Sequence, residues 1–181
     1  MIDPDEILEF WYSEPMNKHW FKSTPVLDEV IRQRYEVLWK QGLSGELAAW
    51  ENNAPGCLAL ILLFDQFPLN MFRGKPESFS SEGRSIELTL QGIERGYDQQ
   101  LPQSRLGFFY LPLMHSENLE HQVLSVLKFE QAGLKDNARF ARHHQNIIKQ
   151  FGRFPHRNAI LGRASTQQEL DYLNSKGAFK G

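Results

Sequence analysis

The sequence predicts an all-α protein of about eight helices, because apolar residues recur at helical spacing through most of the 181 residues. No segment shows the sustained alternation of a half-buried strand, and no two-residue hairpin signal is present. Short turns between helices favour antiparallel helix pairs, and a chain of this length closes one core of ordinary size. We therefore expect a single helical domain over 1–181.

Two helix starts stand out near the N-terminus. Asp3 and Thr24 each precede a proline, and a capping side chain followed by proline is typical of the first turn of a helix. The apolar residues that follow Thr24 form one stripe, which Gly42 closes. The ranges predicted from these signals are 4–11 and 25–41, with a brief helical piece at 46–50.

The most apolar stretch of the chain is 54–64. It is apolar on every side, too long for most buried strands and rich in leucine and alanine, so we predict a central core helix. Phe67 and Pro68 are expected to end this helix. Asp65 lies near the negative end of the helix dipole, where a carboxylate needs a compensating cation or donor. We expect that partner to be an arginine of 153–163.

Four further helices are predicted in the rest of the chain, each marked by a capping residue or a closing glycine. The aromatic segment 98–115, which contains Pro112, is expected to be a loop. The predicted helices cover 77–95, 117–132, 137–151 and the residues after Thr166. Their capping residues are predicted to be Ser116, Asp136, and Ser165 or Thr166, with Gln168 and Glu169 at capping-box distance.

Apolar rows are expected to face the core in three of these helices. His144 falls in one such row, four residues after Phe140, and is therefore predicted to point inward. The predicted inward residues are Ile86, Leu90 and Ile93; Leu119, Val123, Val126 and Leu127; and Phe140, Ile147, Ile148 and Phe151. In the last helix, Leu170 and Leu173 are predicted to be the buried pair.

Charge is distributed unevenly along the chain. The net charge is −2, but residues 1–100 carry 9 Lys/Arg and 16 Asp/Glu, whereas residues 101–181 carry 11 and 6. No acid occurs in 137–168, which holds five arginines. Their counter-charge is expected from the acidic N-terminal half of the same fold or from an anionic ligand. Because the whole chain is slightly acidic, a nucleic acid partner is not expected.

The sequence predicts a cytoplasmic protein without a cofactor. Cys57 is the one cysteine, which excludes an internal disulfide, as in a reducing compartment. No secretory leader opens the chain, and the longest apolar run, 57–64, is far shorter than the roughly 20 residues that span a bilayer. The sequence also lacks phosphate-loop and dinucleotide glycine patterns and paired His/Glu metal spacings. We predict neither membrane insertion nor a bound metal.

The segment 151–166, FGRFPHRNAILGRAST, gathers polar side chains within an aromatic frame. Phe154 and Pro155 interrupt the preceding helix and force these polar groups around a turn. Such a density of cations favours either an anion-binding site or a clasp between helices. The candidate ligand-binding residues are Arg153, Arg157, Asn158 and Arg163, together with Arg73 after the earlier Phe-Pro pair.

Four ionisable residues are candidates for acid–base chemistry if this cluster is enzymatic. His115 and His156 are the predicted proton carriers, and Asp65 and Glu117 are the predicted acid–base or orienting carboxylates. Glu117 is also explained by its place in the first turn of a helix, and His115 by structural hydrogen bonds. The sequence has no Gly-x-Ser-x-Gly elbow, so catalysis has no recognised motif behind it.

Three segments carry a resemblance to a known family: LALILLFDQFPLNMFRG, YLPLMHSENLEHQ and FGRFPHRNAILGRAST. Together they resemble the DUF924 family of uncharacterised, mostly bacterial proteins. The resemblance spans nearly the whole chain and implies an all-helical, tetratricopeptide-like arrangement of helix pairs, with no established activity. The family usually has Asp-Gln-Phe-Pro-Arg-Asn in the first segment, whereas Leu69 replaces the arginine here. If that arginine helps to bind an anion, this chain lacks one contact.

Two functional hypotheses follow. The first is a pocket for a small anion, such as a carboxylate or phosphate, which the sequence leaves open as enzymatic or not. The second is a helical scaffold that binds a peptide or protein partner, with the Arg/His cluster as a structural clasp. The sequence predicts no oligomeric state.

Overall fold

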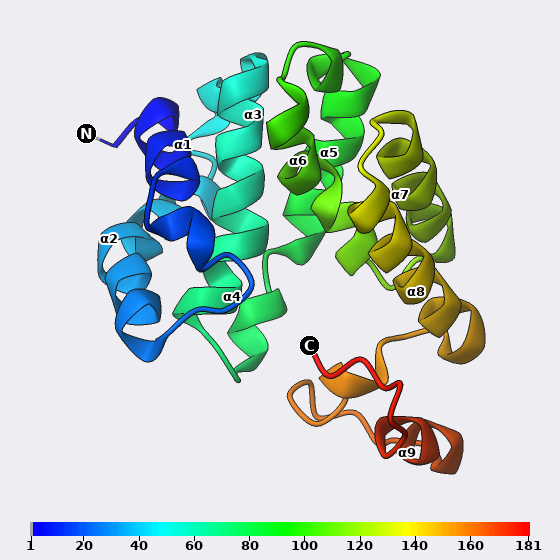
Figure 1. Ribbon diagram of the computed structural model, residues 1–181. Helices are drawn as coiled ribbons and strands as arrows, with labels where there is room; N and C mark the ends of the chain where they lie inside the picture. The colour runs from blue at the N-terminus through cyan, green and yellow to red at the C-terminus, as the bar shows by residue number, and fades with distance from the viewer. Residues whose placement is uncertain (1) are drawn as a thin grey trace. The chain divides into compact units, whose positions relative to one another are not determined.

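The protein is all-helical, as predicted. The computed structural model describes residues 2–181, and these residues contain helices and turns without a β-strand (Figure 1). The chain divides into two compact units. The N-terminal unit runs up to Arg73 and includes Glu77–Pro112, and the C-terminal unit comprises Gly74–Pro76 and Leu113–Gly181. The expectation of a single domain stays a prediction.

The N-terminal unit contains six α-helices, the last of which ends in the C-terminal unit. Their starts confirm the predicted caps, because Asp3 accepts a hydrogen bond from the Glu6 amide and Thr24 accepts one from the Leu27 amide. The bounds are α1 Pro4–Tyr12, α2 Pro25–Leu43, α3 Ala54–Ile61, α4 Phe67–Met71, α5 Glu82–Glu94 and α6 Gln103–His115. Short helical turns lie at Met16–Lys18, Ala48–Asn52, Pro76–Phe79 and Tyr97–Gln99.

Helix α3 is the centre of the N-terminal unit and packs against both α1 and α5. Every residue from Cys57 to Phe64 is at most 2% exposed, which confirms the predicted core helix. Around it, Trp11 and Tyr35 both pack on Phe67, with ring centroids 5.5 and 4.6 Å apart. The apolar stretch Ala54–Met71 is long enough to cross a membrane, but 89% of it is buried inside the protein, as in a core helix.

The prediction that Phe67 and Pro68 end the core helix is wrong. The helix widens into a π-turn at Leu62–Gln66 and continues as α4. Pro68 has no amide hydrogen, so the helix gives the Phe64 carbonyl no partner from that position. The Ser81 hydroxyl donates to this carbonyl at 2.7 Å, and the Trp39 indole donates to the Ser81 oxygen at 3.0 Å. A buried side-chain network therefore replaces the missing helical hydrogen bond.

The segment predicted as a loop at 98–115 instead forms α6. Pro112 lies inside this helix, where a proline costs about 3 kcal/mol. Burial of a large apolar side chain contributes about 2 kcal/mol, and Phe108, Phe109 and Leu111 are all at most 5% exposed. Packing of the aromatic residues therefore outweighs the local cost of the proline.

The C-terminal unit contains α7 Leu119–Gln131, α8 Lys135–Phe151, the turn Pro155–Arg157 and α9 Gln167–Leu173. The capping box of α9 is confirmed, with Thr166 as the cap and Glu169 as its reciprocal partner. The predicted caps of the other two helices are wrong. Asn118 caps α7 by accepting from the Glu120 amide at 2.8 Å, and α8 starts after Leu134 without a side-chain cap.

Several apolar residues predicted to face the core are exposed. In α7 the buried positions are polar or aromatic, Gln122, Ser125 and Phe129. Gln122 is buried because its amide donates to the carbonyls of Met114 and Ser116, both at 2.7 Å. The exposed residues are Leu119, Val123, Leu127, Phe140 and Leu170, and in α5 the buried face is Ser85, Leu88, Thr89 and Gly92. His144 is buried, as predicted.

Candidate functional site

The end of α6 and the start of α7 hold Glu117 in place. Helix α6 ends at His115, and the hydroxyl of Ser116 accepts from the Asn118 amide at 3.1 Å. The buried side-chain amide of Gln122 donates hydrogen bonds to the carbonyls of Met114 and Ser116 in this turn. These hydrogen bonds fix the backbone of the turn that carries the Glu117 carboxylate.

The end of α8 positions the arginine-rich segment. Gly152 adopts a left-handed conformation with φ of 71°, and its amide donates to the Ile148 carbonyl at 2.8 Å. Phe154 then packs into a cluster with Ile147 and Ile148 and is 1% exposed. Because this aromatic anchor is fixed, the side chains of Arg153 and of the residues after Phe154 leave the helix end in defined directions.

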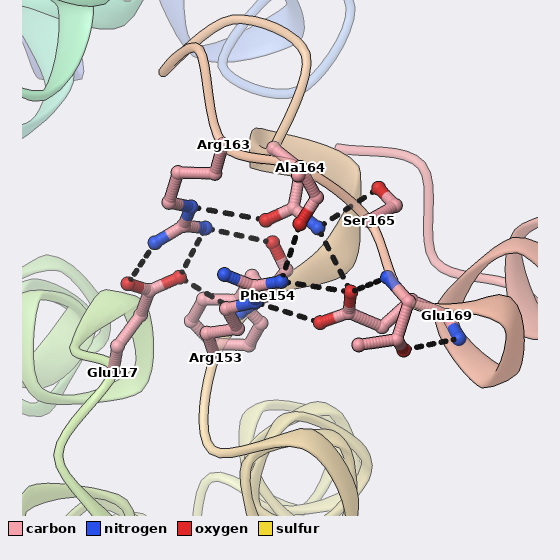
Figure 2. A network of polar contacts seen from close by, with 9 residues as sticks. Glu117, Arg153, Phe154, Arg163, Ala164, Ser165 and Glu169 are labelled. Atoms are coloured by element: carbon pink, nitrogen blue, oxygen red, sulfur yellow. Dashed lines mark hydrogen bonds and ion pairs between the residues drawn. The ribbon is translucent and has the colours of Figure 1, made fainter.

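Glu117 and Arg163 form a two-point ion pair (Figure 2). Arg163 donates from Nη1 to Oε2 at 2.7 Å and from Nη2 to Oε1 at 2.9 Å. The amide of Phe154 also donates to Glu117 Oε1, at 2.7 Å. Both charged side chains are about one quarter exposed, at 27% and 24%. Glu117 therefore joins the turn between α6 and α7 to the segment that follows α8.

Arg153 and Glu169 form a second two-point ion pair. Arg153 donates from Nε to Oε1 at 2.7 Å and from Nη2 to Oε2 at 2.9 Å. The same carboxylate accepts from the Thr166 amide at 2.7 Å as part of the α9 capping box. The Glu169 side chain is 3% exposed, so this pair is much more buried than an ordinary surface ion pair.

Asn158 links the two ion pairs. Its side-chain oxygen accepts from Arg163 Nε at 3.0 Å, and its nitrogen donates to Glu169 Oε2 at 3.3 Å. We call this network the clasp; it consists of Glu117, Arg153, Asn158, Arg163 and Glu169. Two carboxylates balance two guanidinium groups, so the clasp has no net charge.

The clasp keeps both carboxyl groups ionised. Burial alone raises the pKa of Glu117, but the hydrogen bonds from Arg163 and from the Phe154 amide lower it below the ordinary range. The hydrogen bonds from Arg153 lower the pKa of Glu169 to about 2. Neither carboxyl group is therefore suited to accept or release a proton near neutral pH.

Arg157 lies close enough to Glu117 of the clasp to lower the pKa of its carboxyl group, and it is 6% exposed. Its guanidinium stacks over the Phe154 ring at 4.8 Å and donates from Nη2 to the His115 carbonyl at 2.8 Å. The contact with His115 thus uses the backbone carbonyl at the C-terminal end of α6, where a cation is favourable. Arg157 therefore holds the end of α6 against the turn after α8.

Two histidines lie in an aromatic cluster beside Arg157. The ring of Phe179 lies 4.5 Å from that of His144 and 4.9 Å from that of His156. Burial lowers the pKa of both histidines to about 4, and the nearby Arg157 adds to the effect on His156. The Nδ1 atom of His156 is buried without a hydrogen-bond partner among the described residues. Both rings are therefore neutral at physiological pH.

The remaining predicted site residues belong to the N-terminal unit. Arg73 donates to Asp28 from Nε at 2.6 Å and from Nη2 at 3.1 Å, and Asn70 donates to the same carboxylate at 2.8 Å. Asp65 is buried in the π-turn and accepts from the Gln66 side chain at 2.6 Å. Its predicted pairing with an arginine of 153–163 stays a prediction.

The structure brings together seven of the nine predicted site residues in the C-terminal unit and adds one that the sequence analysis placed only in a helix cap. That residue is Glu169, the first acid after the acid-free segment, and this position is the signal that could have identified it. The acids that hold Arg153 and Arg163 both come from the C-terminal half, so the expectation that the N-terminal half supplies them is wrong. Among the described residues, no group of three His, Cys, Asp or Glu side chains could hold a metal ion.

The fold and the clasp define an all-helical protein with an internal Arg–Glu network. The chain belongs to the DUF924 family, described as bacterial proteins of unknown function, whose model matches residues 7–177. It is similar in structure to a protein of unknown function, ATU0120, from Agrobacterium tumefaciens. The identity is 34%, the TM-score is 0.88, and the match covers 94% of this chain and 96% of the other. No curated protein matches the chain.

Proposed function

We propose that the protein is a helical scaffold that binds a peptide or protein partner, and that the clasp is structural. The observation that carries this proposal is that Arg153 and Arg163 each bind a glutamate of the same chain at two points. A small anion would have to displace a carboxylate that already has ideal bidentate geometry. Paired helices of the tetratricopeptide-like kind that the family resemblance implies commonly present binding surfaces for partners.

The small-anion pocket predicted from the sequence remains a second candidate. One observation favours it: the Nδ1 atom of His156 is buried without a hydrogen-bond partner among the described residues, close to the cationic Arg157. Such a group can bind a ligand that brings its own donor or acceptor. We take the protein as cytoplasmic in either case, because Cys57 is a free, buried thiol.

The two candidates are separated by replacing Arg157 with lysine in the full chain. Lysine keeps the charge but loses the planar stacking on Phe154 and the donor geometry toward the His115 carbonyl. We expect the melting temperature to fall by about 5 °C or more, in line with a loss of roughly 1–3 kcal/mol. Phosphate, acetate and citrate at about 10 mM should leave the melting temperature of the wild type unchanged.

The matched control is Arg139→Lys, because the Arg139 side chain is 70% exposed and its contacts, an ion pair with Asp136 and stacking over the exposed Phe140 ring, both lie at the surface. This variant should melt within about 1 °C of the wild type. The proposal fails if one of the three anions raises the wild-type melting temperature by several degrees and the Arg157→Lys variant loses that response. Such a result would establish the anion pocket instead.

A further inference from the structure

The outer side of the α7–α8 pair carries an apolar row. Leu119, Val123 and Leu127 repeat every four residues on α7 and are 42%, 51% and 46% exposed. Their spacing places them on one ridge of the helix surface, about 12 Å long at 1.5 Å per residue. The buried face of α7 consists of Gln122, Ser125 and Phe129. The ridge therefore belongs to a different face of the helix, which the C-terminal unit leaves exposed.

A row of four basic residues and one asparagine, which we call the basic row, runs along the exposed side of α8. Its members are spaced by four, three, four and three residues, which places them in one line along the helix. They are Lys135, Arg139, Arg142, Asn146 and Lys149, all exposed. Asp136 is the one acid of α8, and the sequence then has none up to Gln168. The row therefore has a net positive charge.

The two rows lie on the same side of the helix pair. Helices α7 and α8 pack along each other, and Arg142 of the basic row forms an ion pair with Glu130 of α7. Glu130 follows Leu127 by three residues and so continues the line of the apolar ridge. The apolar row of α7 and the basic row of α8 thus run side by side. The ion pair between Arg142 and Glu130 joins them near the turn that connects the two helices.

We infer that this surface, formed by Leu119, Val123 and Leu127 with Arg139, Arg142 and Lys149, docks an acidic amphipathic helix of a partner protein. The inference rests on the proposed scaffold function and names the chemistry of its partner. Leucine-like side chains of the partner cover the α7 ridge, and its flanking Asp or Glu residues meet the α8 row. When ridges of residues spaced by four pack together, the two helix axes cross at about −50°. A partner helix that packs on the α7 ridge at this angle therefore extends over α8.

The internal ion pairs of the basic row do not compete strongly with such a partner. Arg142 and Glu130 are each 50% exposed, and Arg139 and Asp136 are 70% and 85% exposed. Exposed pairs of this kind contribute at most about 1 kcal/mol, so their arginines exchange readily to a partner carboxylate. A second copy of this chain is disfavoured as the occupant, because a symmetric contact would bring two basic rows together.

The test uses a fluorescein-labelled peptide of about 18 residues with leucine at every third or fourth position and glutamate beside each leucine. Fluorescence anisotropy with the full-length protein should show saturable binding. A peptide with lysine in place of every glutamate, and one with serine in place of every leucine, should bind at least about tenfold more weakly.

Variants of the protein then locate the binding surface. Val123→Glu and Arg142→Glu should each weaken binding of the acidic peptide at least about tenfold with unchanged circular dichroism. Loss of the exposed pair with Glu130 should lower the melting temperature of Arg142→Glu by at most about 4 °C. The matched control is Val37→Glu on α2, because Val37 is a valine of similar kind that is 67% exposed. This control should bind like the wild type.

Three results would overturn the inference. The first is no binding of the acidic peptide at about 500 µM, and the second is equal weakening by Val37→Glu. The third is tighter binding of phosphatidylserine vesicles or duplex DNA than of the acidic peptide, which would assign the basic row to those surfaces. Val123 and Arg142 lie outside the clasp, so these results are independent of the Arg157→Lys experiment that tests the scaffold proposal.

Discussion

Glu117 and Arg163 lie 46 residues apart in the chain and form a two-point ion pair with N–O distances of 2.7 and 2.9 Å. This contact ties the start of α7 to the turn that follows α8. A half-buried bidentate pair contributes more than a surface pair, and loss of one partner leaves the other charge poorly compensated. The clasp is therefore expected to stabilise the C-terminal unit.

Replacement of Glu117 by glutamine tests this expectation. The amide keeps the shape of the side chain but loses the charge that Arg163 compensates, so the free energy of unfolding should fall by about 1–3 kcal/mol. Urea unfolding of the full chain measures this change. Glu120→Gln is the control, since Glu120 is exposed two residues into α7, and it should change the stability by less than about 0.5 kcal/mol. Equal effects of the two substitutions would contradict a stabilising clasp.

The depressed pKa of His144 predicts a loss of stability on acidification. Burial lowers its pKa from 6.5 in the unfolded chain to about 4 in the folded protein, so the unfolded state binds more protons between these values. Stability is fully present above pH 6.5 and falls as the pH decreases toward 4, by about 3 kcal/mol for this group. His115, His143 and His156 are the other ionisable groups that act on the ring, and all three disfavour its protonation, whereas the hydrogen bond with the Phe140 carbonyl favours it.

Urea unfolding at several pH values between 7.5 and 4 measures this loss in ~0.5 pH steps. His144→Gln should roughly halve the dependence in this range, because His156, whose pKa burial also lowers to about 4, keeps its own contribution, whereas His143→Gln, at an exposed position, should leave the slope nearly unchanged. An unaltered slope in His144→Gln would refute the assignment. Below this range the clasp adds a second loss, because Glu169 contributes stability above pH 4.5 that is lost as the pH falls toward its folded pKa of about 2.

Gly56 is predicted to tolerate no side chain. A Cβ atom at this position of α3 would lie 2.2 Å from the Trp50 carbonyl oxygen, which is backbone and cannot move aside cheaply. Gly56→Ala should therefore destabilise the protein by roughly 2 kcal/mol or more despite the better helix propensity of alanine. Gly83→Ala in α5 is the opposite case, since nothing lies within 4 Å, and it should stabilise by about 0.5–1 kcal/mol. Thermal melting of both variants checks this contrast, and a loss of stability in Gly83→Ala would contradict it.

The hydroxyl of Ser81 is predicted to be essential for the continuous core helix. Ser81→Ala would remove the donor to the Phe64 carbonyl and the acceptor of the Trp39 indole, both in the buried core. The expected cost is about 2–4 kcal/mol, because two buried polar groups lose their partner. Ser80→Ala is the control, since the Ser80 hydroxyl bonds only to the Glu77 carbonyl at an exposed site. Similar stability of the two variants by urea unfolding would show that the network is dispensable.

Local signals in the sequence predicted much of the fold. Asp3, Thr24 and the Thr166–Glu169 box all form the predicted caps, because a cap depends on residues three positions apart. The core helix at 54–64 was also predictable, since it is apolar on every side and needs no knowledge of its neighbours. Where the local signal was a proline, at Pro68 and Pro112, the prediction failed because buried contacts maintain both helices.

The candidate site was predictable as a set of residues but not as a network. The sequence placed Arg153, Arg157, Asn158 and Arg163 together because they share one short segment. Their partners are distant in the chain, and Glu117 and Glu169 emerge as those partners only once the helices are packed. The family resemblance agreed with the all-helical class that residue spacing predicts, whereas the pairing of charges required the structure.

By itself the sequence determined the all-helical class, the starts of its capped helices and the position of the cationic turn. These features depend on contacts within one helical turn or on composition. Only the tertiary structure decided which face of α7 is buried and which carboxylates neutralise the arginines. Gln122 lies inside and Val123 outside because the Gln122 amide satisfies the carbonyls around the end of α6, a requirement set by a neighbouring element. The turn at 151–166 is thus a cationic segment in the sequence and one half of a neutral clasp in the folded protein.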